Sequence, residues 1–483
     1  MKNVICPSKS EPPPSRGAAV PAVSPGVSPV IRFTRERAAR PTIRPPSLLW
    51  RFVFPCCAVL SLIDAFAAEP PAAAATNALA ITPALIGRLL AEARTNHPAL
   101  LAQDARTVAA GWNAAAVRTW DDPVFKLGGS ISSPRGSKPS EEGDLIYGLE
   151  QKLPLFGKAG RARRVAAAET AMQEAETEFR VRQLRRDLIT QLVKLARAER
   201  LLEISRQDFT WLETIVAVTE EKYRNSQATQ PDVLTAQNEK SKRANQLLTE
   251  EKNRDYEKVA LNRWVNRALD SPWPALRLPE LAAPLPAASN LIARAAESAP
   301  RLQVWQAQIR QAKATTDLTR RQRLPDFSAG IEGRQFSGDG GFREGLFTLS
   351  FNLPWGNAGK YHHDLRRDQA RLQSVELDAA DFTLSLRHEI NRLAVQTDAA
   401  RREAVLYRDE ILPRARQALE SAHAAWAAGR GPFRDVLDAH RQMLDGETML
   451  NRAIAEQHLI GADLALHGGL AEYDLSATAT TQP

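Results

Sequence analysis

Cysteine is nearly absent from this chain of 483 residues, and its few positions exclude several classes of site. All three cysteines, Cys6, Cys56 and Cys57, lie in an N-terminal segment that we expect to be removed. A mature chain without cysteine has no disulfide framework, no thiol nucleophile and no thiolate metal site. Long apolar runs are also scarce. The one candidate, residues 48–63, is too short to stay in a bilayer as a permanent spanning helix.

An excess of either charge is missing from the body of the chain. The whole sequence has a formal net charge of +8, from 64 Lys and Arg against 56 Asp and Glu. Residues 1–67 hold nine of the bases and three of the acids, which leaves 55 against 53, a net charge of +2. A nearly neutral body argues against a nucleic-acid partner, so we expect none.

The N-terminal segment has the features of an export signal. Several arginines precede the apolar run, and Ala65-Phe66-Ala67 follows it as a small-x-small cleavage site. We expect cleavage after Ala67 and secretion across an inner membrane. Residues 1–67 are then a presequence and residues 68–82 a linker.

Motifs that bind phosphate, activate a nucleophile or hold a metal are missing as well. The sequence has no Gly-rich phosphate loop, and "GGSIS" lacks the second glycine that a nucleophile elbow needs at its fixed offset. His362 and His363 have no third ligand at a helical spacing. We therefore predict that the protein is not an enzyme, and we predict no cofactor and no metal site.

What the chain does contain is a long internal repeat. "PDVLTAQNEK" at 231–240 and "FRDVLDAHRQ" at 433–442 share Asp-Val-Leu-x-Ala at an offset of 203. Earlier matches have offsets of 200 to 203; they include "LEQKLPLFGK" at 149–158 and "LSFNLPWGNAGK" at 349–360. Ordered matches at a nearly constant offset indicate a tandem duplication. We place the copies at 83–269 and 289–470, with a Pro-rich linker at 270–288 and a tail at 471–483.

Each copy repeats one order of elements. A moderate helix is expected first, at 83–119 and 289–322. A very long one follows, at 157–224 and 358–428, with Pro413 as a possible kink. A third is expected at 230–268 and 432–468. Helices this long are typical of coiled-coil-like packing, and two adjoining apolar stripes support this reading: Leu184, Leu188, Leu192 and Leu195 beside Ile189, Val193 and Ala196.

Two segments in each copy alternate like strands, at 124–132 and 145–153, and at 327–336 and 345–353. Each is long enough to cross a membrane when tilted. Four strands cannot close a barrel, since known barrels use about eight or more. If they enter a membrane, three chains would supply twelve strands. The alternative is a pair of amphipathic hairpins on a soluble helical bundle.

These motifs resemble those of the TolC-like outer-membrane efflux channel family. The resemblance covers residues 83–470 and rests on the duplication, on "GLEQKLPLFGKAGRAR" after the second strand, and on "AGRGPFRDVLDAHRQML" at the second helical turn. It implies a mainly α-helical chain with long helices forming a periplasmic α-barrel. Four strands per chain would contribute to a trimeric, 12-stranded outer-membrane β-barrel. It also implies an outer-membrane location extending into the periplasm of a Gram-negative-type bacterium.

The same resemblance suggests site residues at the periplasmic tip. Asp435 and Asp438 match family aspartates around the tunnel entrance, and Asp232 matches the acid of the first turn. For Asp232, helix capping is the competing interpretation. We expect Asn225-Ser226 to replace the turn glycine Gly429, with Asn supplying the left-handed backbone. The expected tip and adaptor contacts are Tyr223, Arg224, Asn225, Trp426, Gly429, Arg430 and Arg434. Of these, Arg430 and Arg434 are expected to reach acids on adjacent helices and latch the closed tunnel.

The resulting hypothesis is a passive export duct. The homotrimer would work with a periplasmic adaptor (membrane fusion protein) and an inner-membrane pump of the resistance-nodulation-division type, in contact with outer-membrane lipid. The cargo would be metal cations or small toxic compounds, since "QKLPLFGKAGRAR" resembles the branch that serves heavy-metal pumps. Two alternatives remain open: the outer-membrane duct of a type I protein secretion system, and a soluble periplasmic coiled-coil adaptor.

Overall fold

The computed structural model describes residues 78–117, 120–131, 143–336 and 340–469. The expected presequence, its cleavage site at Ala67 and the tail at 471–483 lie outside these residues. In the first copy the helices are α1 (Pro83–Asn96), α2 (Pro98–Ala116), α4 (Lys158–Arg224) and α5 (Gln230–Val265). The single helix expected at 83–119 is therefore two. His97 takes an extended conformation between them because Pro98 disfavours a helical residue before it.

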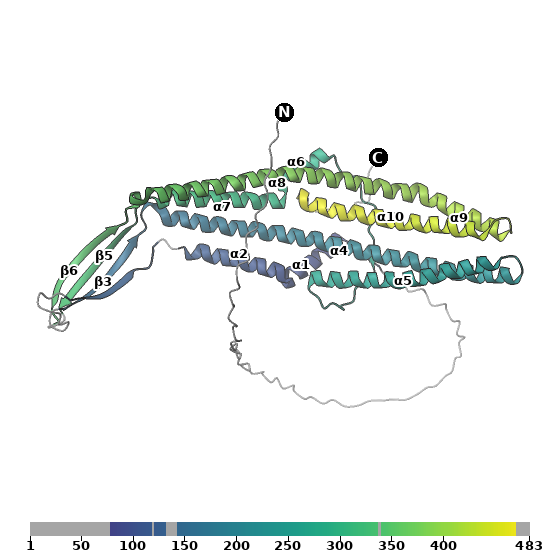
Figure 1. Ribbon diagram of the computed structural model, residues 1–483, viewed down its shortest axis with the longest axis horizontal. Helices are drawn as coiled ribbons and strands as arrows, with labels where there is room; N and C mark the ends of the chain where they lie inside the picture. The colour runs from purple at the N-terminus through teal and green to yellow at the C-terminus, as the bar shows by residue number, and fades with distance from the viewer. Residues whose placement is uncertain (1–77, 118–119, 132–142, 337–339, 470–483) are drawn as a thin grey trace, which may run out of the picture. The chain divides into compact units, whose positions relative to one another are not determined.

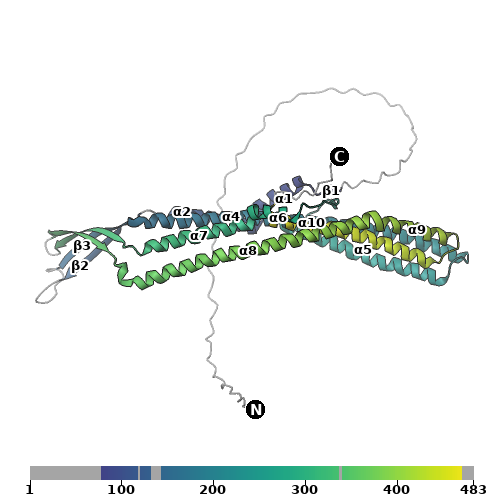
Figure 2. The same ribbon diagram turned by 90° about the horizontal axis from the view of Figure 1, so that it is seen from above.

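The second copy repeats the pattern, with α6 (Ala288–Ser298), α7 (Pro300–Gln322), α8 (Ala358–Leu406), α9 (Leu412–Ala427) and α10 (Phe433–Gly468). The helix expected at 289–322 is also divided, at Ala299, again directly before a proline. In both copies a pair of shorter segments lies along one long helix, as Figures 1 and 2 show.

Pro413 interrupts the second long helix without ending it. A π-helical turn, η3 (Tyr407–Ile411), lies between α8 and α9, with helical backbone angles on both sides. Since proline has no N–H to donate and its ring clashes with the preceding turn, a widened turn accommodates it. Opposite this turn on α10, Gly446 leaves room for Leu412, whose Cδ2 would lie 3.0 Å from a β-carbon at that position.

The helices form a wall whose order follows from their contacts. α4 packs against α2 and α5 on one side and against α7 and α10 on the other, and α8 packs against α7 and α10. From edge to edge the wall is therefore α2 with α5, then α4, then α7 with α10, then α8 (Figure 1). One outermost layer consists of α2 and α5, and the other consists of α8 alone. Each of these two layers has a free side.

The predicted apolar stripes of α4 form the main core. All seven stripe residues are buried, packed with α1, the end of α5 and part of α10. Burial of both stripes confirms that α4 has neighbours on two sides, as the sequence predicts. Two elements were not anticipated: β1 (Leu79–Ala80) and β4 (Leu276–Arg277) pair in parallel within the expected linkers.

The four long strands make one antiparallel sheet in the order β2 (Val124–Ile131), β3 (Gly143–Leu153), β5 (Phe327–Phe336) and β6 (Phe342–Phe351). The expected strand positions are confirmed to within a few residues. The register places Phe125, Leu149, Ile331 and Phe347 in one row across all four strands. The opposite face carries ion pairs, among them Lys126–Glu150 and Arg334–Glu344. One face is thus apolar and the other polar.

The sheet joins the helices through two short helical turns, η1 (Leu155–Gly157) and η2 (Pro354–Asn357), which lead into α4 and α8. Figure 1 shows the sheet at one end of the helices and the two helix turns at the other end. None of the helices within the described ranges contains an apolar stretch of the length that a bilayer-spanning helix needs.

Candidate functional site at the helical tip

Two turns form the tip, one between α4 and α5 and one between α9 and α10, and both have the same backbone hydrogen bonds. Backbone N–H groups of Ser226 and Gln227 donate to the carbonyls of Tyr223 and Lys222, at 3.0 and 2.7 Å. In the second copy, Gly429 and Arg430 donate to Trp426 and Ala425, at 3.1 and 2.9 Å. These bonds satisfy carbonyls that the helix end would leave free. The repeat therefore extends to individual hydrogen bonds, at the offset of 203 that the sequence predicts.

The left-handed residue of the first turn is not the one expected. Ser226 has φ 58°, whereas Asn225 has φ −88° and ψ 13°. Gly429, at the offset of 203 from Ser226, has φ 71°. The prediction that Asn225 adopts the left-handed conformation was wrong. It relied on the tolerance of Asn for that conformation, whereas the repeat offset of 203 aligns Gly429 with Ser226. Asn225 instead donates its side-chain amide to Glu221, at 3.1 Å.

Asp232 caps a helix. Its Oδ2 accepts hydrogen bonds from the backbone N–H of Thr229, at 3.0 Å, and from the Thr229 hydroxyl, at 2.7 Å. Together with Pro231 in the first helical turn, this capping box fixes the start of α5. The carboxylate is thus already engaged within its own chain.

Asp435 and Asp438 lie three residues apart on α10, which places them on one side of that helix. Asp435 is exposed and makes no side-chain hydrogen bond within the described residues. Asp438 is half-exposed and pairs with Arg441 at 3.0 Å and Arg434 at 3.5 Å, both on its own helix. Among the described residues, Asp232 contacts neither of them.

The expected arginine latch is not seen within one chain. Arg434 pairs with Asp438 of its own helix, and Arg430 has no ion pair among the described residues. At the tip, Arg441 forms an ion pair between the two copies, with its guanidinium 2.8 Å from Glu239 on α5. Partial burial acts to raise the pKa of Glu239, but the hydrogen bond from Lys242 and the charge of Arg441 outweigh it. That pKa therefore lies below its ordinary value.

Apolar contacts hold the two tip hairpins together as well. Trp426 is buried in a cluster with Phe433, Val436 and Leu437 of the second copy and with Ile215 and Ala236 of the first. The ammonium group of Lys222 lies 4.9 Å from the Trp426 ring centroid, a cation–π contact. Trp426 is therefore an internal anchor, whereas Tyr223, Arg224, Asn225, Gly429 and Arg430 are exposed.

A buried polar cluster lies next to this apolar cluster, further from the tip turns. The sequence analysis did not predict it. His440 Nε2 on α10 lies 2.6 Å from Asp208 Oδ1 on α4, and Arg243 of α5 pairs with the same carboxylate. The Trp211 ring stacks on the His440 ring at a centroid distance of 3.5 Å. The Asp208 side chain is 1% exposed and that of His440 is 6% exposed. The cluster joins helices of both copies around a buried carboxylate.

A signal for this cluster existed in the sequence. Asp208 lies in line with buried Ser205, Leu212 and Ile215, at the spacing of a core stripe. His440 lies in the same way among Phe433, Val436, Leu437 and Leu444. A charged residue at a core position needs a buried partner. Asp208 and His440 each interrupt an apolar stripe, so the sequence pattern indicated that they could be partners.

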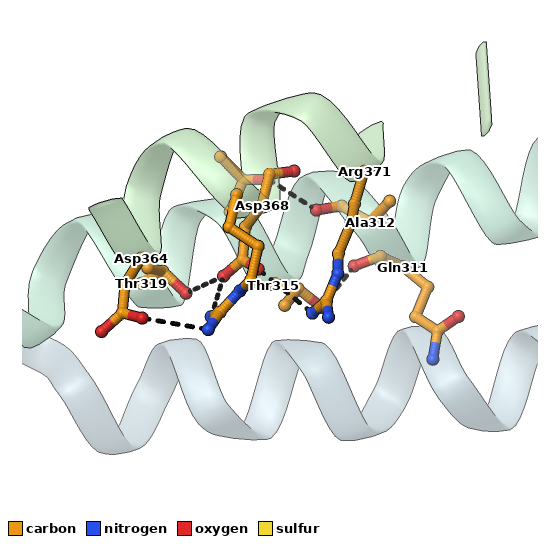
Figure 3. Close-up of polar contacts among 9 residues, drawn as sticks. Gln311, Ala312, Thr315, Thr319, Asp364, Asp368 and Arg371 are labelled. Carbon is orange, nitrogen blue, oxygen red and sulfur yellow. Dashed lines mark hydrogen bonds and ion pairs between the residues drawn. The ribbon is translucent and has the colours of Figure 1, made fainter. Parts of the chain in front are cut away.

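A second buried carboxylate ties α7 to α8 near the sheet (Figure 3). Asp368 accepts a hydrogen bond from the Thr319 hydroxyl at 2.7 Å and from Arg367 Nε at 2.8 Å. The Thr316 hydroxyl donates to the Asp368 carbonyl at 3.3 Å. The Arg367 hydrogen bond lowers the Asp368 pKa, and burial opposes this only in part. Asp368 thus stays charged and holds Arg367 in place.

Metal binding has no support at these positions. Among the residues that the structure describes, no group of three or more His, Cys, Asp or Glu side chains is placed to hold an ion. The rings of His362 and His363 face each other edge to face, 5.7 Å apart.

Together, a duplicated wall of long helices, a four-stranded sheet with one apolar face, and paired tip turns define an outer-membrane duct protein. The model of the outer membrane efflux protein family matches residues 89–267 and 291–466, one match per copy. The chain belongs to this family, and it is an outer-membrane protein whose helices extend into the periplasm.

Solved structures show the same fold. VceC from Vibrio cholerae is 20% identical, with a TM-score of 0.66 over 80% of this chain and 96% of VceC. The open state of MtrE from Neisseria gonorrhoeae is 17% identical, with a TM-score of 0.64 over 80% and 89%. CmeC from Campylobacter jejuni is 14% identical, with a TM-score of 0.63 over 80% and 85%. A comparison with curated proteins gave no match.

Proposed function

We propose that three copies of this chain form a channel that passively exports cargo through the outer membrane. An inner-membrane pump would deliver the cargo through a periplasmic adaptor. The observation that carries this proposal is that one chain is an open wall with two free edges, in its helices and in its sheet alike.

The sheet supplies the first pair of edges. β2 and β6 are its outermost strands, and β2 follows α2 while β6 leads into α8. The strands alternate in direction, so β6 of one copy can pair antiparallel with β2 of the next. A bilayer requires every backbone group to be paired, and three copies close a barrel of twelve strands.

The helices supply matching edges. Large apolar side chains are exposed on both outer layers of the wall: Leu101, Val108 and Trp112 on α2, Leu248 and Tyr256 on α5, and Leu377, Leu384 and Val395 on α8. A monomer in water gains nothing from such rows. Packing α8 of one copy against α2 and α5 of the next buries both in a head-to-tail ring.

The direct test is purification of the signal-cleaved protein from membranes in mild detergent. We expect native mass measurement to give three chains and planar-bilayer recording to give a conducting pore. A monomer in the soluble periplasmic fraction would overturn the proposal in favour of a periplasmic adaptor.

At the tip, Asp435 and Asp438 of three copies would place six carboxylates around the tunnel axis. Such a ring favours cations and disfavours anions. Replacing both with Ala is therefore expected to weaken divalent-cation block and cation preference in single-channel recordings. Because Asp435 is exposed and the Asp438 side chain is 45% exposed, we expect the melting temperature to change little.

The matched control is Asp232→Ala. It removes a capping carboxylate at the same end of the molecule, and the expected loss is about 1 kcal/mol of stability with little change in ion selectivity. If the double variant kept the parent's block and selectivity, the carboxylate ring would not be at these positions.

The exposed tip residues Tyr223, Arg224, Asn225, Gly429, Arg430 and Arg434 are the proposed adaptor contact, with Trp426 beneath them as a buried support. For the cargo we favour metal cations or small toxic compounds, taken from a pump of the resistance-nodulation-division type. Gene deletion should then raise sensitivity to metals, dyes, detergents or antibiotics. Loss of a secreted polypeptide without such sensitivity would instead identify a type I secretion duct.

A further inference from the structure

The helix ends next to the sheet carry positive charge that the chain itself does not neutralise. Residues 154–166 contain four cations and no acid, and two of these cations pair elsewhere in the chain, Lys158 with Asp326 and Arg161 with Asp317. Residues 320–323 contain three further cations. Six exposed cations at this level have no ion pair among the described residues, and together we call them the junction surface: Arg164, Arg320, Arg321, Arg323, Lys360 and Arg366. The body of the chain is close to neutral, so this local excess is distinctive.

The junction surface includes one cation at an unfavourable helix position. α4 and α8 both begin beside the sheet, and neither has an acid in its first turn. Lys360 lies in the first turn of α8, where the positive end of the helix dipole disfavours cations. Arg164 and Arg366 lie one and two turns further along α4 and α8. Residues that break a local rule without a compensating contact point to a partner outside the chain.

Two neighbouring arginines of α8 show the contrast between a structural cation and an unpaired one. Arg367 donates to Asp364 at 2.9 Å and to Asp368 at 2.8 Å, so its charge is used within the chain. Arg366, the neighbouring residue, is exposed and has no such acid. Near the sheet, the cation that takes part in helix packing is therefore paired with acids, whereas its exposed neighbour is not.

Exposed aromatic residues accompany these cations. Trp120 is 53% exposed, Phe156 44% and Trp355 62%, all between the sheet and the helices. Phe156 has φ 59°, a strained conformation for a bulky residue. Its ring lies 6.1 Å from that of Phe327, on the apolar face of the sheet. Aromatic rings at the edge of an apolar band are typical of a membrane–water interface.

We propose that the junction surface binds the anionic headgroups of phospholipids in the periplasm-facing leaflet of the outer membrane. This inference rests on the proposed barrel, because the apolar face of the sheet must lie in the bilayer for the helix ends to lie at headgroup level. Each cation near an anionic membrane surface contributes about a fivefold gain in binding. The chemistry requires a phospholipid whose headgroup carries a net negative charge, and no particular acyl chain.

The test compares the purified parent with the variant Arg164→Gln, Lys360→Gln, Arg366→Gln. All three side chains are exposed and make no ion pair among the described residues, so misfolding is not the expected cause of any loss. Parent and variant are titrated in detergent with phosphatidylglycerol, with phosphatidylcholine or with inorganic phosphate. Retained lipid is counted by native mass measurement. We expect phosphatidylglycerol binding to fall by about tenfold or more in the variant, with phosphatidylcholine unchanged.

The matched control carries Lys194→Gln, Arg197→Gln and Lys252→Gln, three exposed cations in mid-helix. It should bind phosphatidylglycerol like the parent. Equal losses in both variants, no loss in either, or equal protection by inorganic phosphate would overturn the lipid assignment. So would unchanged lipid binding with altered ion selectivity, which would place the cations in the lumen. Conductance of the parent is recorded first, so that failure of the channel proposal itself is recognised separately.

Discussion

Replacing Asp208 with Ala is expected to destabilise the protein by about 3–5 kcal/mol, because it leaves buried partners without their carboxylate. His440 loses the polar contact that the described residues give its Nε2, and Arg243, whose side chain is 21% exposed, loses its ion-pair partner. The His440 ring is also stacked on the Trp211 ring. The thermal and urea unfolding midpoints of the purified protein measure the loss. We also expect more frequent spontaneous opening in bilayer recordings, since the cluster joins the two tip hairpins.

The pair Glu213–Lys240 provides the control for Asp208. It links the same two helices, α4 and α5, at 3.1 Å, but the Glu213 side chain is 48% exposed. Glu213→Ala should therefore change stability by less than about 1 kcal/mol. Similar unfolding midpoints for the two variants would mean that Asp208 is not a stability-determining residue.

The features predicted well from sequence are those that depend on periodicity and repetition. The apolar stripes of α4 and the alternation in β3 and β6 appear directly in the residue pattern, and the repeat offset of 203 also fixes the second tip turn. The divisions at His97 and Ala299 could have been predicted too, because each precedes a proline. They were missed because the helical pattern continues across the break.

The polar contacts were less predictable, since they depend on which helices become neighbours. Arg434 and Arg430 flank the turn and suggested a latch, but helix geometry directs Arg434 to Asp438, four residues along. Arg441, one helical turn beyond Asp438 in α10, pairs with Glu239 of α5. Choosing between these arginines requires the rotation of α10 against α5, which a single sequence does not specify.

The cluster around Asp208 also shows where the two copies have diverged. At the repeat offset of 203, Asp208 corresponds to Ile411, Arg243 to Gly446 and Gln237 to His440. Each copy thus supplies part of a bridge that the other copy does not repeat. Ile411 and Gly446 lie instead at the π-helical turn, where Gly446 makes room for Leu412. The duplication produced two equivalent hairpins. Their sequences then diverged, so that the contact between Asp208 and His440 occurs only once in the pair.

Cross-linking residues 239 and 441 is expected to abolish current through the channel. Arg441 and Glu239 approach to 2.8 Å and belong to different hairpins of one chain, so a covalent link prevents α10 from moving away from α5. The segment after residue 67 contains no cysteine, which makes the engineered pair Glu239→Cys, Arg441→Cys the only thiols once the presequence is removed. A bifunctional maleimide with a reducible linker can join them in the purified protein.

Bilayer current is then measured before and after reduction, and we expect reduction to restore it. The matched pair Glu213→Cys, Lys240→Cys links two helices of the same hairpin, so its cross-linked form should conduct like the parent. Single-cysteine variants, treated in the same way, account for modification alone. If the 239–441 link formed fully and the current persisted, passage through the tip would not require the two hairpins to separate. Arg441 and Glu239 would then stabilise the tip without controlling its opening.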